Sequence, residues 1–222
     1  MLSIQEEFLE AIKNGDRTKI EHLLETNPWL ATTKTTTGVS ATVFALYNRN
    51  ARVATTIAGK KGKLDIFEAA SLGQLTQVKD LIRHNSSLVN SYSADGFTPV
   101  ALAAYLGQKE TVEYLIENGA DVNAVAKNTT GYTPLTGAVS QNHTEIAKML
   151  VKSGADVNHS YEGGFTPLTH AAFSGNTELV AFLLDHGADP NTKTSDGRSP
   201  LSFAVEKNYL EITGLLKKHG AR

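Results

Sequence analysis

A unit of about 33 residues occurs four times in succession in this chain, and no other sequence feature constrains its fold as strongly. Each copy begins with a glycine, and a proline follows three residues later. The prolines stand 35, 33 and 33 residues apart, at Pro99, Pro134, Pro167 and Pro200. Self-similarity at such a period is typical of a stacked array, in which each unit buries its apolar surface against its neighbours. The repeat therefore predicts a solenoid.

Each copy reads as two helices followed by an extended link. A hydroxyl residue precedes each proline, and an N-cap of this kind with Pro at the first helical position is a strong helix start. Gly or Asn ends the first helix, because these two residues best tolerate a left-handed turn. The second helix carries apolar residues at helical spacing, for example Val180, Leu183 and Leu184. In the last copy Lys217 replaces Leu184, which predicts a polar outer face on a terminal cap.

The pattern extends upstream of the four copies. Ala69 and Gly73 match Ala103 and Gly107, and residues 8–32 repeat the same unit again. Between these two upstream units, the stretch 38–62 is shorter and carries Arg49 where the other units have Gly or Asn. We expect this unit to form two short helices that a tight turn joins to the next unit.

We therefore predict an all-α repeat solenoid of about seven stacked helix–turn–helix units with hairpin loops, forming one domain over residues 1–222. The first and last units act as caps. The predicted units span approximately residues 3–37, 38–62, 63–95, 96–130, 131–163, 164–196 and 197–222.

These units resemble ankyrin repeats. The sequences GFTPLTHAA at 164–172 and GADVN at 119–123 and 154–158 are similar to the family motif. The resemblance is specific for residues 63–222 and weaker for 1–62. It implies a curved stack with hairpins projecting from one side, a concave face made by the hairpins and first helices, and a protein-binding role.

The family's motif histidine is replaced throughout. The residues at that position are Ala101, Thr136, Thr169 and Ser202, and His170 lies one place later. Because the resemblance makes that histidine a structural hydrogen-bonding group, we expect its loss to affect stability and not the fold.

Composition limits the chemistry of the chain. It has 222 residues, is 41% hydrophobic and contains no cysteine, which excludes disulfides and thiolate metal sites. The N-terminus lacks the basic start and apolar run of a signal peptide, and no stretch approaches the roughly 18 apolar residues of a membrane span. We expect a cytoplasmic monomer.

No catalytic motif is present. The chain has no Gly-rich phosphate loop, no His-Glu-x-x-His and no Gly-x-Ser-x-Gly, and its seven histidines are scattered. Carboxylates repeat at the starts of the second helices, where they suit the helix dipole: Glu110, Glu145, Glu178 and Glu211. We therefore expect no enzyme activity, no cofactor and no metal ion.

Aromatic residues recur at positions that the stack places along its concave side. They follow the motif glycines, precede them by four residues, or end the first helix. Together with basic residues at the same positions they form the candidate partner-binding set: Tyr92, Phe97, Tyr105, Lys127, Tyr132, Phe165, Phe173 and Arg198. Aromatic and Arg side chains carry much of the energy of interfaces. The alternative is that the rings pack sideways on neighbouring hairpins and are half buried, and both can hold together.

The charge is uneven along the chain. Six basic residues and no Asp or Glu lie between Lys34 and Lys63, so this stretch has a formal charge of +6 and the remainder of the chain, whose net charge is −2, has −8. This uneven charge distribution could orient a charged partner. The other interpretation is a solvated, degenerate repeat.

We predict a non-catalytic protein–protein interaction module, an adaptor, scaffold or inhibitor that binds a partner protein through its concave face and hairpin loops. The alternative is an electrostatic binder of nucleic acid or an anionic surface through residues 34–63, against which the acidic remainder argues.

Overall fold

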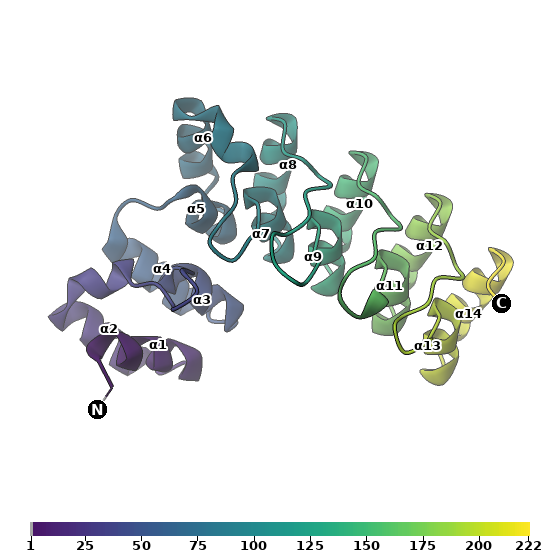
Figure 1. The fold of residues 1–222 in the computed structure, drawn as a ribbon, viewed down its shortest axis with the longest axis horizontal. Coiled ribbons are helices and arrows are strands. Elements are labelled where there is room, and N and C mark those ends of the chain that lie inside the picture. The colour runs from purple at the N-terminus through teal and green to yellow at the C-terminus, as the bar shows by residue number, and fades with distance from the viewer. Residues whose placement is uncertain (1) are drawn as a thin grey trace. The chain divides into compact units, whose positions relative to one another are not determined.

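The structure is a computed structural model that describes residues 2–222 and, within them, contains α-helices, short 3-10 turns and no β-strand (Figure 1). The chain forms two compact units, one ending at Pro99 and the other running from Val100 to Arg222. The all-α repeat architecture predicted from the sequence is confirmed.

The N-terminal unit contains three helix pairs. Their members pack on each other, and 3-10 turns follow the first and third pairs. The helices are α1 (Ile4–Asn14), α2 (Arg17–Thr26), α3 (Ala41–Tyr47), α4 (Ala51–Lys61), α5 (Ile66–Leu72) and α6 (Leu75–His84), with η1 (Pro28–Thr32) and η2 (Ser86–Asn90).

The C-terminal unit holds the regular copies. Its first helices α9, α11 and α13 lie side by side, and so do its second helices α8, α10, α12 and α14. The bounds are α7 (Pro99–Tyr105), α8 (Lys109–Glu117), α9 (Pro134–Ser140), α10 (Thr144–Lys152), η3 (Glu162–Gly164), α11 (Pro167–Ser174), α12 (Thr177–Asp185), α13 (Pro200–Glu206) and α14 (Leu210–Lys218). In the described residues the helices alternate as first and second members throughout, which is compatible with the seven predicted units.

Three first helices of the C-terminal unit begin at hydroxyl capping boxes. In α9 the backbone N–H of Thr133 donates to Thr136 Oγ1 at 2.7 Å, and the N–H of Thr136 donates to Thr133 Oγ1 at 3.3 Å. The same reciprocal pair opens α11 and α13. Two otherwise unsatisfied donors are paired at each start. Thr136, Thr169 and Ser202, three of the four residues that replace the motif histidine, therefore make local hydrogen bonds of their own.

The left-handed positions at the ends of the first helices are occupied as the sequence predicts. Gly107 and Gly175 have φ of 79° and 77°, and Asn142 has φ of 61°. Arg49 adopts the same conformation with φ of 58°, although a side chain is disfavoured there. The degenerate unit therefore keeps the left-handed turn, with backbone strain at Arg49.

The degenerate unit has the expected tight turn to the next unit, but its helices are not shorter than those of the regular units. Helix α3 has 7 residues, as α9 and α13 do, and α4 has 11, more than any second helix of the C-terminal unit. The missing residues come from the link, because only residues 62–65 separate α4 from α5. Gly62 makes this turn with φ of 83°.

A buried ion pair fixes the turn between α4 and α5. Lys61 Nζ lies 2.7 and 2.6 Å from the two carboxylate oxygens of Glu68, whose side chain is 1% exposed while that of Lys61 is 15% exposed. Glu68 also accepts the backbone N–H of Asp65 at 3.1 Å in a capping box. One of the six basic side chains between Lys34 and Lys63 is therefore neutralised within the fold.

An asparagine ladder connects successive links of the C-terminal unit. Asn158 Nδ2 donates to the carbonyl of Gly187 at 3.0 Å, and Asn158 Oδ1 accepts the N–H of Asp189 at 2.9 Å. Asn123 and Asn191 make the same two bonds to the links that follow them. The Asn of each GADVN or GADPN segment therefore joins its repeat to the next one.

The C-terminal cap is less polar than the sequence predicts. Lys217 is exposed as expected, but Val205 and Leu210 are 58% and 76% exposed. Val205 occupies the position of Ala172, which is fully buried one unit earlier. The outer face of the last unit is therefore a mixture of charged and apolar side chains.

Candidate partner-binding surface

Two neighbouring hairpins of the C-terminal unit fix the residues that follow the motif glycines. The N–H of Tyr161 donates to the carbonyl of Phe165 at 2.9 Å, and the N–H of Thr194 donates to the carbonyl of Arg198 at 2.9 Å. Each bond closes a tight hairpin around its glycine. Phe165 and Arg198 therefore stand at matching places on successive hairpins.

Hydrogen bonds also run from hairpin to hairpin. The N–H of Glu162 donates to the carbonyl of Thr130 at 2.9 Å, and the N–H of Ser195 donates to the carbonyl of Gly163 at 2.8 Å. At Gly164 a Cβ would lie 2.9 Å from the N of Ser195, and φ is +73°, so glycine is required for this close approach. The hairpins form a continuous row whose side chains are held in register.

Six rings on these hairpins and the adjoining first helices form an aromatic cluster. Its members are Tyr132, Tyr161, Phe165, His170, Phe173 and Phe203. Contacting ring centroids lie 5.0 to 6.5 Å apart, within the range of favourable aromatic pairs. Phe165 lies at the centre, 5.8 Å from Phe203 and 6.3 Å from both Tyr161 and Phe173.

Two cations lie over rings of the aromatic cluster. The guanidinium of Arg198 is 4.3 Å from the centroid of Phe203, and Lys207 Nζ is 3.9 Å from the centroid of Phe173. Both separations suit a cation–π interaction. Arg198 and Lys207 form the cationic edge of the aromatic cluster.

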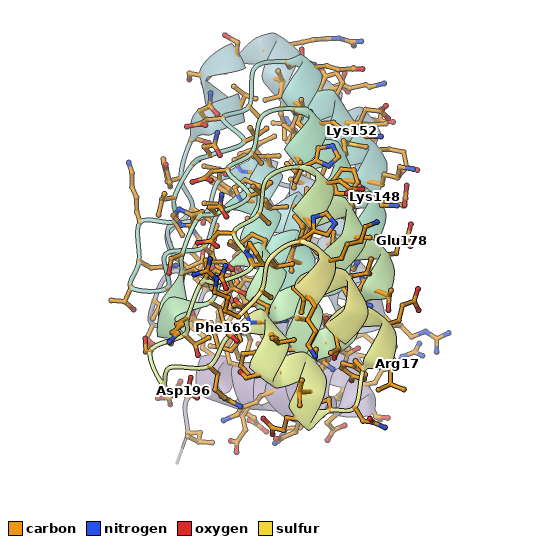
Figure 2. The ribbon with its side chains drawn as sticks, turned by 90° about the vertical axis from the view of Figure 1, so that its right-hand side faces the viewer. Arg17, Lys148, Lys152, Phe165, Glu178 and Asp196 are labelled. Atoms are coloured by element: carbon orange, nitrogen blue, oxygen red, sulfur yellow. The ribbon has the colours of Figure 1, made fainter. Side chains whose placement is uncertain are left out.

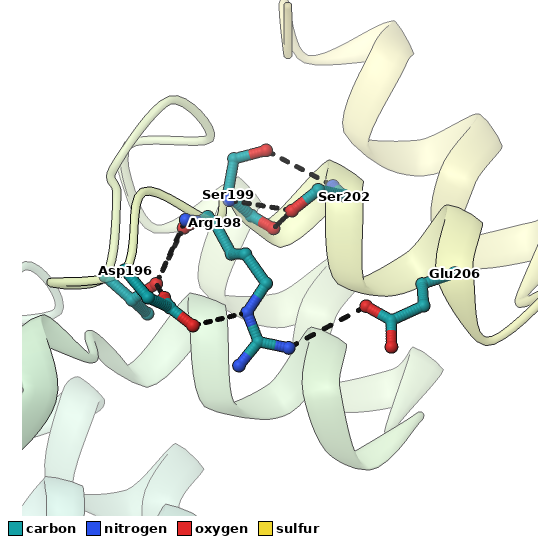
Figure 3. Close-up of polar contacts among 6 residues, drawn as sticks. Asp196, Arg198, Ser199, Ser202 and Glu206 are labelled. Atoms are coloured by element: carbon teal, nitrogen blue, oxygen red, sulfur yellow. Dashed lines mark hydrogen bonds and ion pairs between the residues drawn. The ribbon is translucent and has the colours of Figure 1, made fainter.

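Arg198 is held in place by two carboxylates (Figure 3). Its Nε lies 2.7 Å from Asp196 Oδ2, and its Nη1 lies 3.7 Å from Glu206 Oε2. The hydroxyl of Thr194 donates to Asp196, which is the largest cause that lowers the pKa of this carboxyl, and Arg198 adds to it. The guanidinium is thereby oriented before any partner arrives.

Burial divides the aromatic cluster into a base and a rim. Tyr161 and Phe203 are buried, Tyr132 and Phe165 are half buried, and Phe173 is 37% exposed. Phe173 is among the few large apolar side chains of the described chain that remain exposed. The base supports the rim, and the rim is available for contact.

The base contains one side-chain hydrogen bond. The hydroxyl of Tyr161 lies 2.9 Å from Nδ1 of His170, and burial lowers the pKa of His170 and raises that of Tyr161. Burial also raises the pKa of Tyr132. With His170 neutral, Nδ1 can accept the phenol proton, so the pair is satisfied at neutral pH.

The structure brings together four of the eight residues predicted from the sequence. Tyr132, Phe165, Phe173 and Arg198 belong to the aromatic cluster or its cationic edge, and the rings pack sideways on neighbouring hairpins as the alternative interpretation expected.

The other four predicted residues lie on earlier parts of the chain, and Tyr105 is near enough to Tyr132 to contribute to the raised pKa of that phenol. Tyr105, at the end of α7, is half buried, and its carbonyl contacts His143 Nε2 at 3.1 Å. Lys127 lies exposed in the hairpin loop 124–130. Tyr92 and Phe97 are half buried in the N-terminal unit.

Four members of the surface were not predicted: Tyr161, His170, Phe203 and Lys207. His170 and Phe203 occupy the same position of successive first helices, four residues after the capping hydroxyl. This periodic position, four residues after the capping hydroxyl, is the sequence signal that identifies His170 and Phe203. Lys207 stands at the end of a first helix, one of the columns that the sequence singles out, but its position over Phe173 depends on the packing of α11 against α13.

The opposite side of the C-terminal unit has a different character. Figure 2 shows Phe165 and Asp196 on the hairpin side, whereas Lys148, Lys152 and Glu178 lie on the second helices. Lys148 forms ion pairs with Glu178 of the next unit and with Glu145. That side is a charged, solvated surface, and exposed ion pairs of this kind stabilise little.

The described part of the chain has neither a cluster of metal-binding side chains nor a membrane-spanning helix. Within residues 2–222 no three His, Asp or Glu side chains are grouped so that they could hold a metal ion. No helix in the same range is long and apolar enough to cross a membrane.

Paired helices with hydroxyl-proline starts, hairpins joined edge to edge and an asparagine ladder define a helical repeat protein. A family model of ankyrin repeats in three copies matches residues 66–161 and 158–222. The chain therefore belongs to the ankyrin repeat family, whose members generally mediate protein–protein interactions and are typically not enzymes.

Individual relatives match a smaller part of the chain. It is 42% identical over 64 residues to "DNA-binding protein RFXANK" of Homo sapiens, an alignment that covers 29% of this chain and 25% of that protein. It is 38% identical over 64 residues to "Ankyrin repeat and SAM domain-containing protein 6" of Danio rerio, covering 29% of this chain and 9% of the relative. "Ankyrin repeat domain-containing protein 49" of Homo sapiens is 42% identical over 57 residues, 26% of this chain and 24% of the relative. The alignments thus span a quarter or less of these relatives.

Proposed function

We propose that this chain is a non-catalytic interaction module that binds a partner protein through the aromatic cluster and its cationic edge. The observation that carries the proposal is Phe173, an exposed ring set on a buried aromatic base with Lys207 over its face. Interface hot spots are rigid, well-packed aromatic and Arg side chains near the centre of a contact.

The surface is preorganised, which favours affinity. Phe173 contacts Phe165 and Phe203 edge to face, and Arg198 is held by Asp196 and Glu206. Side chains that are already ordered lose little conformational entropy on binding. A partner with an apolar anchor for Phe173 and a carboxylate for Lys207 would be complementary to this rim.

The proposal includes a cytoplasmic location and a monomeric state in the absence of the partner. A chain without cysteine suits a reducing compartment. Light scattering on the purified protein tests the monomer: a mass near 23.8 kDa supports it, and twice that mass contradicts it.

Site-specific photo-crosslinking tests the surface. A benzoyl-phenylalanine replaces Phe173 in one protein and Phe182 in another; Phe182 is a half-buried ring on α12, a second helix of the same repeat. We expect one partner protein to be crosslinked from position 173 and not from position 182. Equal crosslinking from both positions, or crosslinking from 182 alone, contradicts the proposal.

A further inference from the structure

An open groove lies between α4 and the α5–α6 pair of the N-terminal unit. Ala58 and Gly59 of α4 line one side, Gln74 and Gln77 line the other, and Leu64 and Leu72 contribute apolar surface. The groove is remote in sequence from the aromatic cluster and lies in the other compact unit. It is not part of the surface described above.

The short link explains why this groove is open. Between α8 and α9 the link of residues 118–133 buries Val122, Ala124 and Ala126. Between α4 and α5 only residues 62–65 are present, so no comparable segment is available. Helix α4 packs against α2, but the close packing that joins α8 to α10, α10 to α12 and α12 to α14 is not found between α4 and α6.

Gly59 widens the groove. It is exposed in the interior of α4, and a Cβ placed there would meet nothing within 4 Å. Glycine at such a place destabilises a helix relative to alanine. No contact within the N-terminal unit requires the missing side chain, so the space over Gly59 is free for the main chain of another molecule.

The charges near the groove are mostly positive. Arg52 stands seven residues before Gly59 and therefore on the same face of α4, and Lys60 and Lys63 are exposed beside the C-terminal end of that helix. Lys61 is neutralised by Glu68. Across the groove, Asp80 of α6 is already paired with Arg83 at 3.4 Å.

We infer that this groove is a second docking site, which binds an extended acidic segment of a partner protein. The occupant is set by charge complementarity to Arg52, Lys60 and Lys63, and by the apolar surface of Ala58, Leu64 and Leu72. Thr55, Ala58 and Gly59 of α4 line the groove over about 6 Å of helix, which roughly two extended residues fill. The lining contains no aromatic ring for base stacking, which favours a peptide over single-stranded nucleic acid.

Selection from a phage library of random 12-residue peptides tests this inference on the full chain. We expect the selected peptides to be enriched in Asp and Glu. Gly59→Gln fills the groove and Arg52→Glu with Lys63→Glu reverses its charge, and each variant should weaken the selected peptides at least tenfold in a fluorescence anisotropy titration.

Gly214→Gln is the matched control. Gly214 is also an exposed helical glycine at which a Cβ would meet nothing within 4 Å, but it lies on α14. Both glycine variants should raise the melting temperature, because Gln favours helix more than Gly. Only Gly59→Gln should lose peptide binding, so a loss cannot be ascribed to unfolding.

Four results overturn the inference. One is a selection without acidic enrichment, and another is peptide affinity that Gly59→Gln leaves unchanged. The third is a 20-nucleotide single strand that binds more tightly than any selected peptide and is lost with the charge reversal alone, which would assign the basic residues to nucleic acid. Because Phe173→Ala leaves this groove intact, loss of peptide binding in that variant also contradicts it.

Discussion

Replacing Glu68 with Gln should destabilise the N-terminal unit more than any exposed carboxylate would. Gln keeps the acceptor that the capping box needs, so the change removes the charge and little else. Lys61 is then left largely buried without its counter-ion. Breaking a buried pair in this way costs about 3–5 kcal/mol, and we expect a value near the lower limit because Lys61 retains some access to water.

Urea unfolding followed by tryptophan fluorescence measures this effect in the right part of the chain. The single tryptophan, Trp29, lies in the N-terminal unit. Glu6→Gln is the matched control, because Glu6 occupies the same capping-box position of α1 but is exposed. We expect the control to change the free energy of unfolding far less, because water screens an exposed carboxylate.

If Glu68→Gln lowers the free energy of unfolding no more than Glu6→Gln does, the buried ion pair does not stabilise the N-terminal unit. A second variant, Lys61→Met combined with Glu68→Gln, removes the unpaired charge. It should recover part of the lost stability, since an apolar replacement of a buried pair is often close to neutral. A double variant that is less stable than Glu68→Gln alone would show that the lysine stem, and not its charge, matters.

Three further predictions concern the repeat and its turns. Asn158→Ala removes both ladder bonds to the next link and should lower the free energy of unfolding by about 1–3 kcal/mol in urea titrations; no change would mean that water replaces the ladder. Arg49→Gly relieves the left-handed strain and should raise that free energy by about 0.5–1 kcal/mol, whereas a loss would show that the Arg side chain makes a stabilising contact. Because burial lowers the pKa of His170 below 6.5, the unfolded chain binds more protons below that pH, and stability should fall as the pH drops through about 6.5. Comparing the free energies of unfolding of wild type and His170→Asn at pH 5 and pH 7.5 isolates the contribution of His170. An identical pH dependence in the two proteins contradicts the prediction.

The regular repeats could be predicted from the sequence because each residue type has a local physical reason. Proline after a hydroxyl cap starts a helix, and Gly or Asn ends it, as at Thr133 and Asn142. These effects act within a few residues of the chain. The degenerate unit was harder, because Arg49 adopts the left-handed turn although its residue type disfavours that conformation.

The aromatic surface could be predicted only in part. The residues after the motif glycines are periodic, so Tyr132 and Phe165 stand out in the sequence. The buried base formed by Tyr161 and Phe203 depends on how far each ring reaches across the neighbouring repeat, which no local pattern encodes. The exposure of Phe173 and Val205 likewise follows from which side chains the adjoining unit covers.

The affinity of the crosslinked partner for Phe173→Ala tests the central proposal most directly. Phe182→Ala, on the second helix of the same repeat, is the control, and the melting temperature of each variant reports its stability. We predict that Phe173→Ala weakens binding about 30-fold, which corresponds to about 2 kcal/mol, and that Phe182→Ala leaves the dissociation constant within about twofold of wild type. If Phe173→Ala lowers the melting temperature while the affinity of the folded protein stays the same, the aromatic cluster stabilises the stack and is not the binding site.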